Sequence, residues 1–214
     1  MSDELKPSLA QRIKADIRSD VLAQNTLLTQ AELSERYKVS RIPVRDALKE
    51  LLADGWLVTH GKRGVKVPPL NAEQAQELYL MRLPLERLAL ELAFEHLNFA
   101  ILGQATDILE QSKQPGHSAL ELGRLNWQFH WCLYQPCQRP ILLKTLDQLH
   151  QQTERYIGYQ SAQLNYHQTS ENEHCELIEA LSAKNLQKAL DILHRHIEVA
   201  GRLLIEHFRV PRSG

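Results

Sequence analysis

Residues 39–51 read VSRIPVRDALKEL, and they indicate most clearly how the N-terminal part of the chain folds. Ser40 is of a type that caps helices, and Pro43 falls in the first turn, where proline is tolerated. Three apolar residues recur at helical spacing and would face a core: Val44, Leu48 and Leu51. We therefore expect a helix over about 41–54, capped by Ser40 and stopped by Gly55.

Two further helices are expected before this stretch and a β-hairpin after it. A stripe with a spacing of four residues predicts the first helix over 8–22, through Leu9, Ile13, Ile17 and Val21. Thr29 opens a capping-box pattern, which predicts a short helix over about 30–37. Short β-type runs at 56–59 and 65–67 enclose a basic turn bounded by glycines. Together these elements predict a winged helix-turn-helix.

The helix over 41–54 carries the residue types that recognise DNA. A recognition helix enters the major groove and presents its N-terminal residues to the base edges. The candidates here are Ser40, Arg41, Arg45 and Lys49. The hairpin tip would act as a wing on the backbone or minor groove, through Gly61, Lys62 and Arg63. Each residue alone is better explained as solvated surface, but the joint arrangement favours DNA binding.

From Asn71 onward the pattern is helical to the end. Helices are expected near 71–97, 99–113, 117–135, 140–159, 168–183 and 185–208. Pro68 and Pro69 indicate a linker. We therefore expect a mainly α protein with two domains, a winged helix-turn-helix over 1–68 and an all-helical bundle over 69–214 for effector binding and dimerisation.

Composition limits the class of protein. The 214 residues are 43% hydrophobic and 24% charged, as in globular proteins, and no apolar run approaches the roughly 20 residues that span a bilayer. An acidic N-terminus and three cysteines, an odd number, favour a cytoplasmic protein without a disulfide framework. Residues 1–70 hold 12 basic against 9 acidic side chains, which favours this part as the one that meets a polyanion.

The last two expected helices bring two histidines together. If they form a hairpin turning near Lys184, then His174 and His196 lie at about the same height and both face inward. His130 faces inward on another helix, four residues after Asn126. Three imidazoles and an amide oxygen could hold a divalent metal with positions left open for a ligand. Ordinary core histidines, hydrogen-bonded to their surroundings, are the alternative.

Residues 9–68 resemble the winged helix-turn-helix domain of GntR-type bacterial transcription regulators. The run over 39–51, continued by Asp54-Gly55-Trp56-Leu57, is close to that family's signature. The resemblance implies that Ser40, Arg41 and Arg45 contact the operator and that the turn over 61–64 is the wing. The chain departs from the pattern in two loops: Asp20 replaces an expected glycine, and Gln24-Asn25 replaces a Pro-Gly pair.

Residues 71–208 resemble the helical FCD domain of the FadR-type branch of these regulators. The matching pieces are Tyr79-x-x-Arg82-x-x-Leu85-Glu86, Phe129-His130, and His174-x-x-x-Ile178-x-Ala180-Leu181. The resemblance implies a metal, zinc or nickel, held by an aspartate and three histidines beside a small carboxylate effector. By position the ligands are His130, His174 and His196, with Asn126 where the aspartate is expected. An asparagine keeps an oxygen donor but loses the charge, which weakens metal binding; without metal, the histidines and Arg82 could hold an anion directly.

We therefore expect a homodimeric bacterial regulator that binds a pseudo-palindromic operator in double-stranded DNA under the control of a small-molecule effector. The candidate effector-binding residues are Arg82, His150 and Tyr156. The alternative for Arg82 is an ion pair on the helix surface, and packing explains the other two equally well. The alternative function is a metal-dependent enzyme that acts on a small carboxylate at the three histidines. No general base is evident for it, since Glu173 and Glu176 flank His174 but are expected to point elsewhere. A metal-independent adaptor that binds a partner helix is a third, weaker hypothesis.

Overall fold

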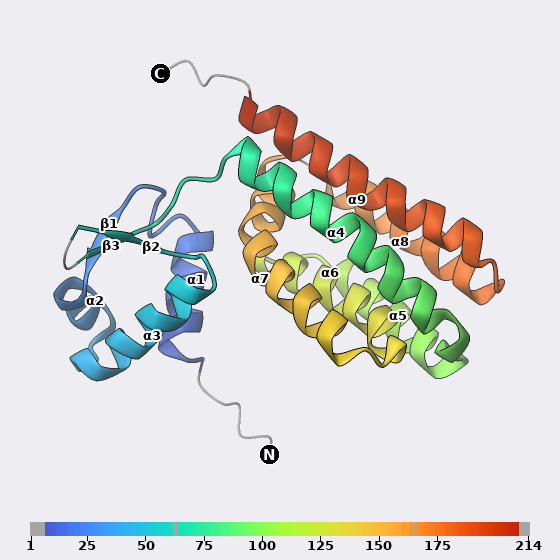
Figure 1. The fold of residues 1–214 in the computed structure, drawn as a ribbon, viewed down its shortest axis with the longest axis horizontal. Helices are drawn as coiled ribbons and strands as arrows, with labels where there is room; N and C mark the ends of the chain where they lie inside the picture. The colour runs from blue at the N-terminus through green and yellow to red at the C-terminus, as the bar shows by residue number, and fades with distance from the viewer. Residues whose placement is uncertain (1–6, 62–63, 165, 210–214) are drawn as a thin grey trace. The chain divides into compact units, whose positions relative to one another are not determined.

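The computed structural model describes residues 7–61, 64–164 and 166–209 (Figure 1). Its internal contacts divide the chain into two compact units, Met1–Leu70 and Asn71–Gly214. Among the described residues, no helix combines the length and the apolarity that crossing a bilayer requires.

The N-terminal unit is a three-helix domain with a small sheet. Its elements are α1 (Leu9–Arg18), β1 (Leu27–Thr29), α2 (Gln30–Tyr37), α3 (Arg41–Ala53), β2 (Val58–His60) and β3 (Gly64–Lys66). The antiparallel sheet has the order β1-β3-β2, so β3 pairs with both neighbours. The winged helix-turn-helix is as expected, and β1 is a strand that the sequence pattern did not indicate.

A single apolar core holds these elements together. Seven side chains that are at most 1% exposed form its centre: Ile13, Leu33, Val44, Leu51, Trp56, Leu57 and Val67. Burying each such side chain stabilises the fold by about 1.5–3 kcal/mol. An ion pair of 2.8 Å between Lys14 Nζ and Asp54 Oδ2 joins α1 to the end of α3. The core therefore fixes α3 through one face and leaves the opposite face exposed.

Two predicted caps have different outcomes. The capping box at Thr29 is confirmed, because its hydroxyl accepts from the Glu32 amide while the Glu32 carboxylate accepts from the Thr29 amide. Ser40 occupies the N-cap position of α3, but its side chain makes no capping hydrogen bond. Our expectation that it caps with its hydroxyl is wrong, and the hydroxyl is left exposed at the start of the helix.

The first helix ends earlier than its apolar stripe predicts. Asp20 adopts a left-handed conformation with φ of 59°, which takes the chain out of the helix. As a result Val21 is 56% exposed, and Leu22 enters the core in its place. Asn25 is also left-handed, with φ of 67°. The two positions where the GntR resemblance leads us to expect glycine thus keep the backbone conformation that glycine adopts freely.

The C-terminal unit consists of helices, and no strand occurs in the part of it that the structure describes. Its elements are α4 (Ala72–Ala93), η1 (Phe94–His96), α5 (Phe99–Ser112), α6 (Ala119–Tyr134), η2 (Gln135–Cys137), α7 (Pro140–Gln163), α8 (His167–Ser182) and α9 (Leu186–Arg209). Six long helices were expected, and their predicted bounds agree with the observed ones to within a few residues at most ends.

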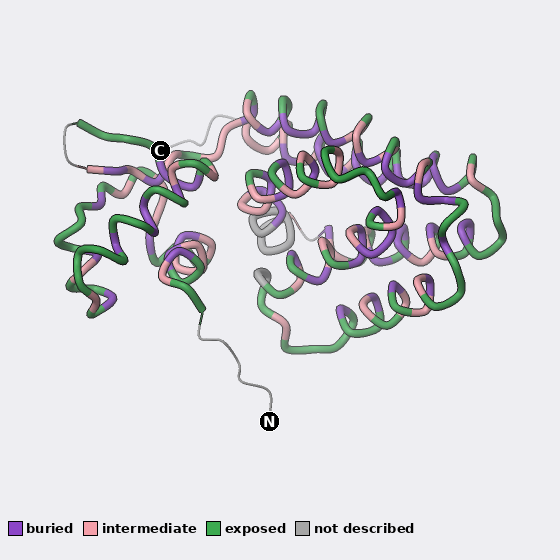
Figure 2. Tube along the Cα trace, turned by 60° about the horizontal axis from the view of Figure 1, so that its bottom comes forward, coloured by how far each residue is buried: buried purple, intermediate pink, exposed green. Residues whose placement is uncertain are grey.

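The six long helices form a closed ring of packed pairs. Helix α4 packs on α9, α9 on α8, α8 on α5, α5 on α6, α6 on α7, and α7 on α4 again. Figure 2 shows the buried residues along the inner sides of these helices and the exposed ones outside. Side chains that point inward from different helices therefore meet inside the ring.

The left-handed Asp20 leads to a test of stability. We expect Asp20→Gly to raise the free energy of unfolding by about 0.5–1 kcal/mol, because relief of the left-handed strain exceeds the entropic cost of glycine. Ser19→Gly, at a neighbour with φ of −82°, is the control and should lower stability by a similar amount. Urea denaturation followed by circular dichroism measures both. A loss of stability in Asp20→Gly contradicts the assignment.

Candidate functional site

The exposed face of α3 carries the predicted DNA-contacting residues. Ser40, Arg41, Arg45 and Lys49 are all exposed. The Arg45 side chain is 58% exposed, and its nearest acidic partner is Asp46, whose Oδ1 lies 3.6 Å from Nε. An exposed pair at that distance contributes little, so the guanidinium can exchange it for another anion.

The wing lies at the β2–β3 turn of the same unit. Gly61 is exposed, with φ of +59°. Lys62 and Arg63, which we expect at the wing tip, lie outside the described residues. The turn therefore follows the expected pattern up to its tip.

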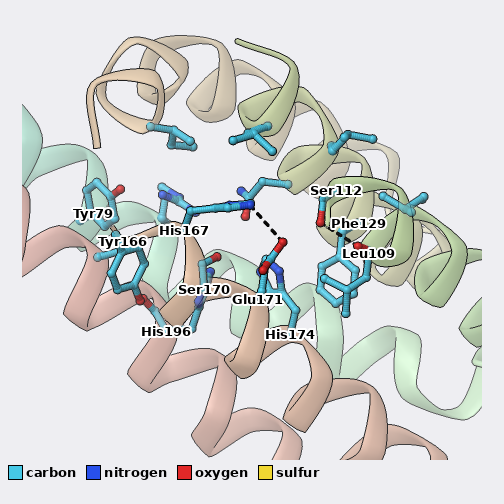
Figure 3. A pocket seen from close by; sticks show the side chains of 17 residues that line it. Tyr79, Leu109, Ser112, Phe129, Tyr166, His167, Ser170, Glu171, His174 and His196 are labelled. Carbon is cyan, nitrogen blue, oxygen red and sulfur yellow. Dashed lines mark hydrogen bonds and ion pairs between the residues drawn. The ribbon is translucent and has the colours of Figure 1, made fainter. Parts of the chain in front are cut away.

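The C-terminal unit contains a small, partly open cavity of about 50 Å³ (Figure 3). A buried water needs roughly 10–15 Å³ of such space, so the cavity has room for a few waters or one small ligand. Among the predicted site residues, Arg82, Asn126, His174 and His196 line it. The Tyr79 ring lies against Gly201 of α9, where a Cβ atom would come within 2.6 Å of it. The glycine allows α4 and α9 to approach closely.

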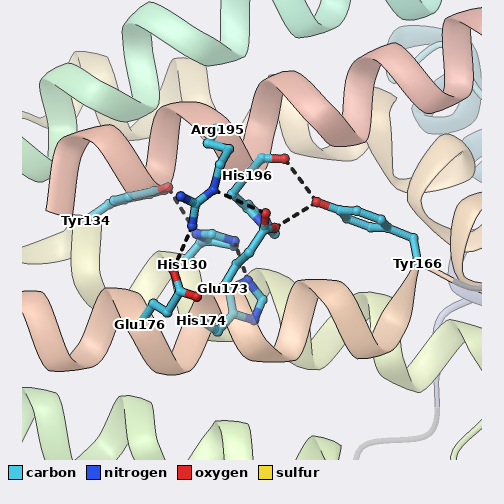
Figure 4. Close-up of polar contacts among 8 residues, drawn as sticks. All are labelled: His130, Tyr134, Tyr166, Glu173, His174, Glu176, Arg195 and His196. Atoms are coloured by element: carbon cyan, nitrogen blue, oxygen red, sulfur yellow. Dashed lines mark hydrogen bonds and ion pairs between the residues drawn. The ribbon is translucent and has the colours of Figure 1, made fainter. Parts of the chain in front are cut away.

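The three predicted histidines meet beside this cavity (Figure 4). His130 comes from α6, His174 from α8 and His196 from α9. Their ring centroids are 4.7–5.2 Å apart, and one nitrogen of each ring lies within 4.8 Å of the others. All three rings are buried.

Glu173 orients one of these rings. His196 Nδ1 donates to Glu173 Oε2 at 2.8 Å, and the Tyr166 hydroxyl donates to the same oxygen at 2.8 Å. Burial raises the pKa of Glu173, but the hydrogen bonds from His196 and Tyr166 bring it below its usual value, so the carboxyl is ionised. Our expectation that Glu173 points away from the histidines is therefore wrong. Glu176 does point elsewhere, and it pairs with Arg195 at the surface.

A second buried carboxylate orients His130 through a tyrosine. The Tyr134 hydroxyl donates to Glu86 Oε2 at 2.7 Å, and its oxygen lies 3.1 Å from His130 Nδ1. Since the hydroxyl proton points to Glu86, His130 Nδ1 must be the donor to Tyr134. Arg82 Nε donates to the other Glu86 oxygen at 2.6 Å and balances its charge. Arg82 is thus a buried ion-pair residue, and the sequence-based alternative of a surface pair is wrong.

These contacts determine the state of the imidazoles. Burial lowers the pKa of both His130 and His174 well below the usual range, with further lowering by neighbouring histidines, so both rings are neutral near pH 7. Because the neutral His130 donates from Nδ1, its Nε2 atom carries a lone pair. Donation from Nδ1 to Glu173 likewise leaves a lone pair on His196 Nε2 in the neutral form of that ring. His174 Nε2 lies 3.1 Å from His130 Nε2 and donates to it. With His196 neutral, two lone pairs and one N–H converge at this point.

Two candidate effector-binding residues lie elsewhere. His150 stacks on Trp127, with centroids 3.9 Å apart, and does not line the cavity. Tyr156 is 1% exposed, and its hydroxyl donates to Gln74 Oε1 at 2.9 Å. Both side chains pack within the helical ring, which was the alternative that their sequence positions allowed.

One polar face of α8 was not predicted from the sequence. Four of its residues follow a spacing of three, four and seven and line the cavity: His167, Ser170, Glu171 and His174. The inward position of His174 was recognised from the apolar residues that follow it. Extending the same helical period toward the N-terminus would have found the other three.

Two family descriptions match the chain. The FCD domain matches residues 77–199, and the gntR family of bacterial regulatory proteins matches residues 5–67. The Nta operon transcriptional regulator of Aminobacter aminovorans is 33% identical over 144 residues, which cover 66% of this chain and 69% of that protein. The HTH-type transcriptional regulator McbR of Escherichia coli (strain K12) is 27% identical over 148 residues, which cover 66% and 67%.

Solved structures share the fold. E. coli McbR/YncC gives a TM-score of 0.75 at 23% identity and covers 95% of this chain and 100% of that one. A putative GntR transcriptional regulator from Rhodococcus sp. RHA1 gives 0.77 at 19% identity, with coverage of 94% and 97%. The chain belongs to the GntR family of bacterial regulatory proteins: it is a DNA-binding transcription regulator with a ligand-binding FCD domain, and not an enzyme.

Proposed function

We propose that this regulator binds a divalent metal at the three histidines and a small carboxylate effector beside it, and that the effector controls operator binding. The convergence of three buried imidazole nitrogens carries the proposal. Effector binding would act by favouring one arrangement of the DNA-binding units over another, through the linker at Pro68 and Pro69.

The donor set fits a metal such as zinc or nickel. Metal-binding histidines are commonly held by a carboxylate on the nitrogen that does not bind the ion, as Glu173 holds His196 here. His130 has the same arrangement through Tyr134. Asn126 lines the cavity and supplies an amide oxygen as a further donor. His174 would bind once the proton on Nε2 moves to Nδ1 or leaves.

The charges around the cavity explain why an anion would need the metal. Arg82 is the guanidinium in the lining, but Glu86 already balances it at 2.6 Å. A bound divalent ion would supply open positions and a positive charge for a carboxylate. Because Asn126 is neutral where an aspartate is expected, the ion would keep more of its charge for the effector.

A second copy of the chain is the proposed partner in DNA binding. A pseudo-palindromic operator requires two recognition helices related by two-fold symmetry. A surface groove of about 460 Å³ runs between α4 and α9, and apolar residues such as Leu80, Leu83 and Ile205 line it. Leu80 is 67% exposed, and Pro84 and Leu88, at steps of four along α4, are exposed as well. We propose that this stripe packs against its counterpart in the second copy.

The recognition helix can be tested on a duplex that the wild-type protein selects from random sequence. We expect Arg45→Ala to weaken binding about 5- to 150-fold, because one bidentate arginine–base contact contributes about 1–3 kcal/mol. Arg124→Ala, at an exposed position of α6, is the control and should bind like wild type. Sedimentation of the complex should give two chains per duplex. Wild-type affinity and salt dependence in Arg45→Ala would exclude a contact by this residue.

The metal can be tested by elemental analysis of protein purified without chelators or a histidine tag. We expect close to one zinc or nickel ion per chain in wild type, and about a tenth of that or less in His174→Ala. His194→Ala, whose side chain is 46% exposed on α9, is the control and should keep its metal. Absence of metal from all three proteins would refute the metal and leave direct anion binding by the histidines.

A further inference from the structure

We propose that Glu171 binds a positively charged amino group of the effector, so that the ligand is a small amino-carboxylate, such as an α-amino acid. The inference rests on the proposed function, because the histidine site would bind the carboxylate end of the same molecule. Glu171 would be a second point of contact with the effector, and it would restrict the effector from carboxylates in general to amino-carboxylates.

Glu171 is a buried carboxylate that faces the cavity. It is 7% exposed and belongs to the lining (Figure 3). Its position, three residues before His174, puts the two side chains on one face of α8. The carboxylate is not part of the cluster formed by the three imidazoles. It therefore offers a separate point of contact in the same small space.

The described residues around Glu171 do not provide a cation that is hydrogen-bonded to its carboxylate. Its Oε1 atom lies 3.0 Å from His167 Nε2, yet this oxygen is buried without a well-aligned hydrogen bond from any described residue. His167 carries a positive charge only when protonated, and its side chain is 35% exposed, so it can turn toward solvent. Lys113 interacts electrostatically with Glu171, but its ammonium group donates its hydrogen bond to Glu110 at 2.6 Å. A buried carboxylate that receives no hydrogen bond from a cation is costly, and an ammonium group that donates to it removes this cost.

The other charged groups near the cavity already have partners. Glu86 balances Arg82, and Glu173 accepts hydrogen bonds from His196 and Tyr166. Among the described carboxylates Glu171 is the one that lines the cavity. A ligand with a carboxylate at one end and an ammonium at the other matches both the histidine site and Glu171. The cavity volume of about 50 Å³ restricts such a ligand to a small one.

The test compares matched ligands on metal-loaded, full-length protein. The probes are α-amino acids and the α-hydroxy acids of the same carbon skeletons, with binding measured by calorimetry. For the skeletons that bind, we expect wild type to bind the amino acid at least about tenfold more tightly, as expected for a charge-assisted hydrogen bond. Glu171→Gln should reduce this preference to near unity, and Glu171→Asp should retain part of it.

Three controls make the outcome decisive. Glu176→Gln, at the exposed pair on the same helix, should keep the wild-type preference. Circular dichroism should show that each variant is folded, and elemental analysis should show an unchanged metal content in Glu171→Gln. Loss of the metal from that variant would make Glu171 a metal ligand and overturn the proposal.

The remaining outcomes separate the two proposals. A preference for hydroxy acids in wild type, or an amino-acid preference that survives Glu171→Gln, overturns the role of Glu171 alone. Absence of binding by both series overturns the small carboxylate effector, and with it this inference.

Discussion

The C-terminal domain depends on buried carboxylates that hold imidazole protons away from the centre of the helical ring. Glu173 accepts directly from His196, and Glu86 acts on His130 through Tyr134. Each contact fixes which ring nitrogen carries the proton, and therefore which one offers a lone pair. Without them, the rings would adopt whichever tautomers satisfied their own hydrogen bonds. With them, the protons of His130 and His196 on Nδ1 are held away from the site of the proposed metal.

The charge balance of this domain narrows what the site can bind. Arg82, which its sequence position suggested as the anion-binding group, is compensated by Glu86 and cannot attract an anion without giving up that partner. Asn126 brings no charge of its own. In our proposal, a metal ion supplies the positive charge that the cavity lacks, and Glu171 supplies the negative charge. The N-terminal domain has a simpler design, in which an apolar core fixes α3 and leaves its basic face exposed.

Much of this architecture could be predicted because helical periodicity and chain reversal are local rules. His174 and His196 lie at similar distances from the turn at Lys184, so paired helices had to bring them together. Glu173 was missed because adjacent helical residues point about 100° apart, and the sequence did not reveal that α9 packs on that side of α8. The left-handed conformation of Asp20 and Asn25 was missed for another reason. Glycine is the usual sequence signal of a positive φ, and neither position has a glycine. The capping hydrogen bond predicted for Ser40 is absent, because a residue can occupy the N-cap position without pointing its hydroxyl at the helix backbone.

Nitrogen-15 NMR of the histidine side chains tests where the ring protons lie. In chelator-treated protein near pH 7, we expect His130 to be protonated at Nδ1 and bare at Nε2, and His196 to carry a proton on Nδ1. Glu173→Gln should disturb the pattern of His196 while leaving that of His130 intact. The reverse tautomer at both rings, with a proton on Nε2 and none on Nδ1, would contradict this arrangement, because the lone pairs would then point away from the site.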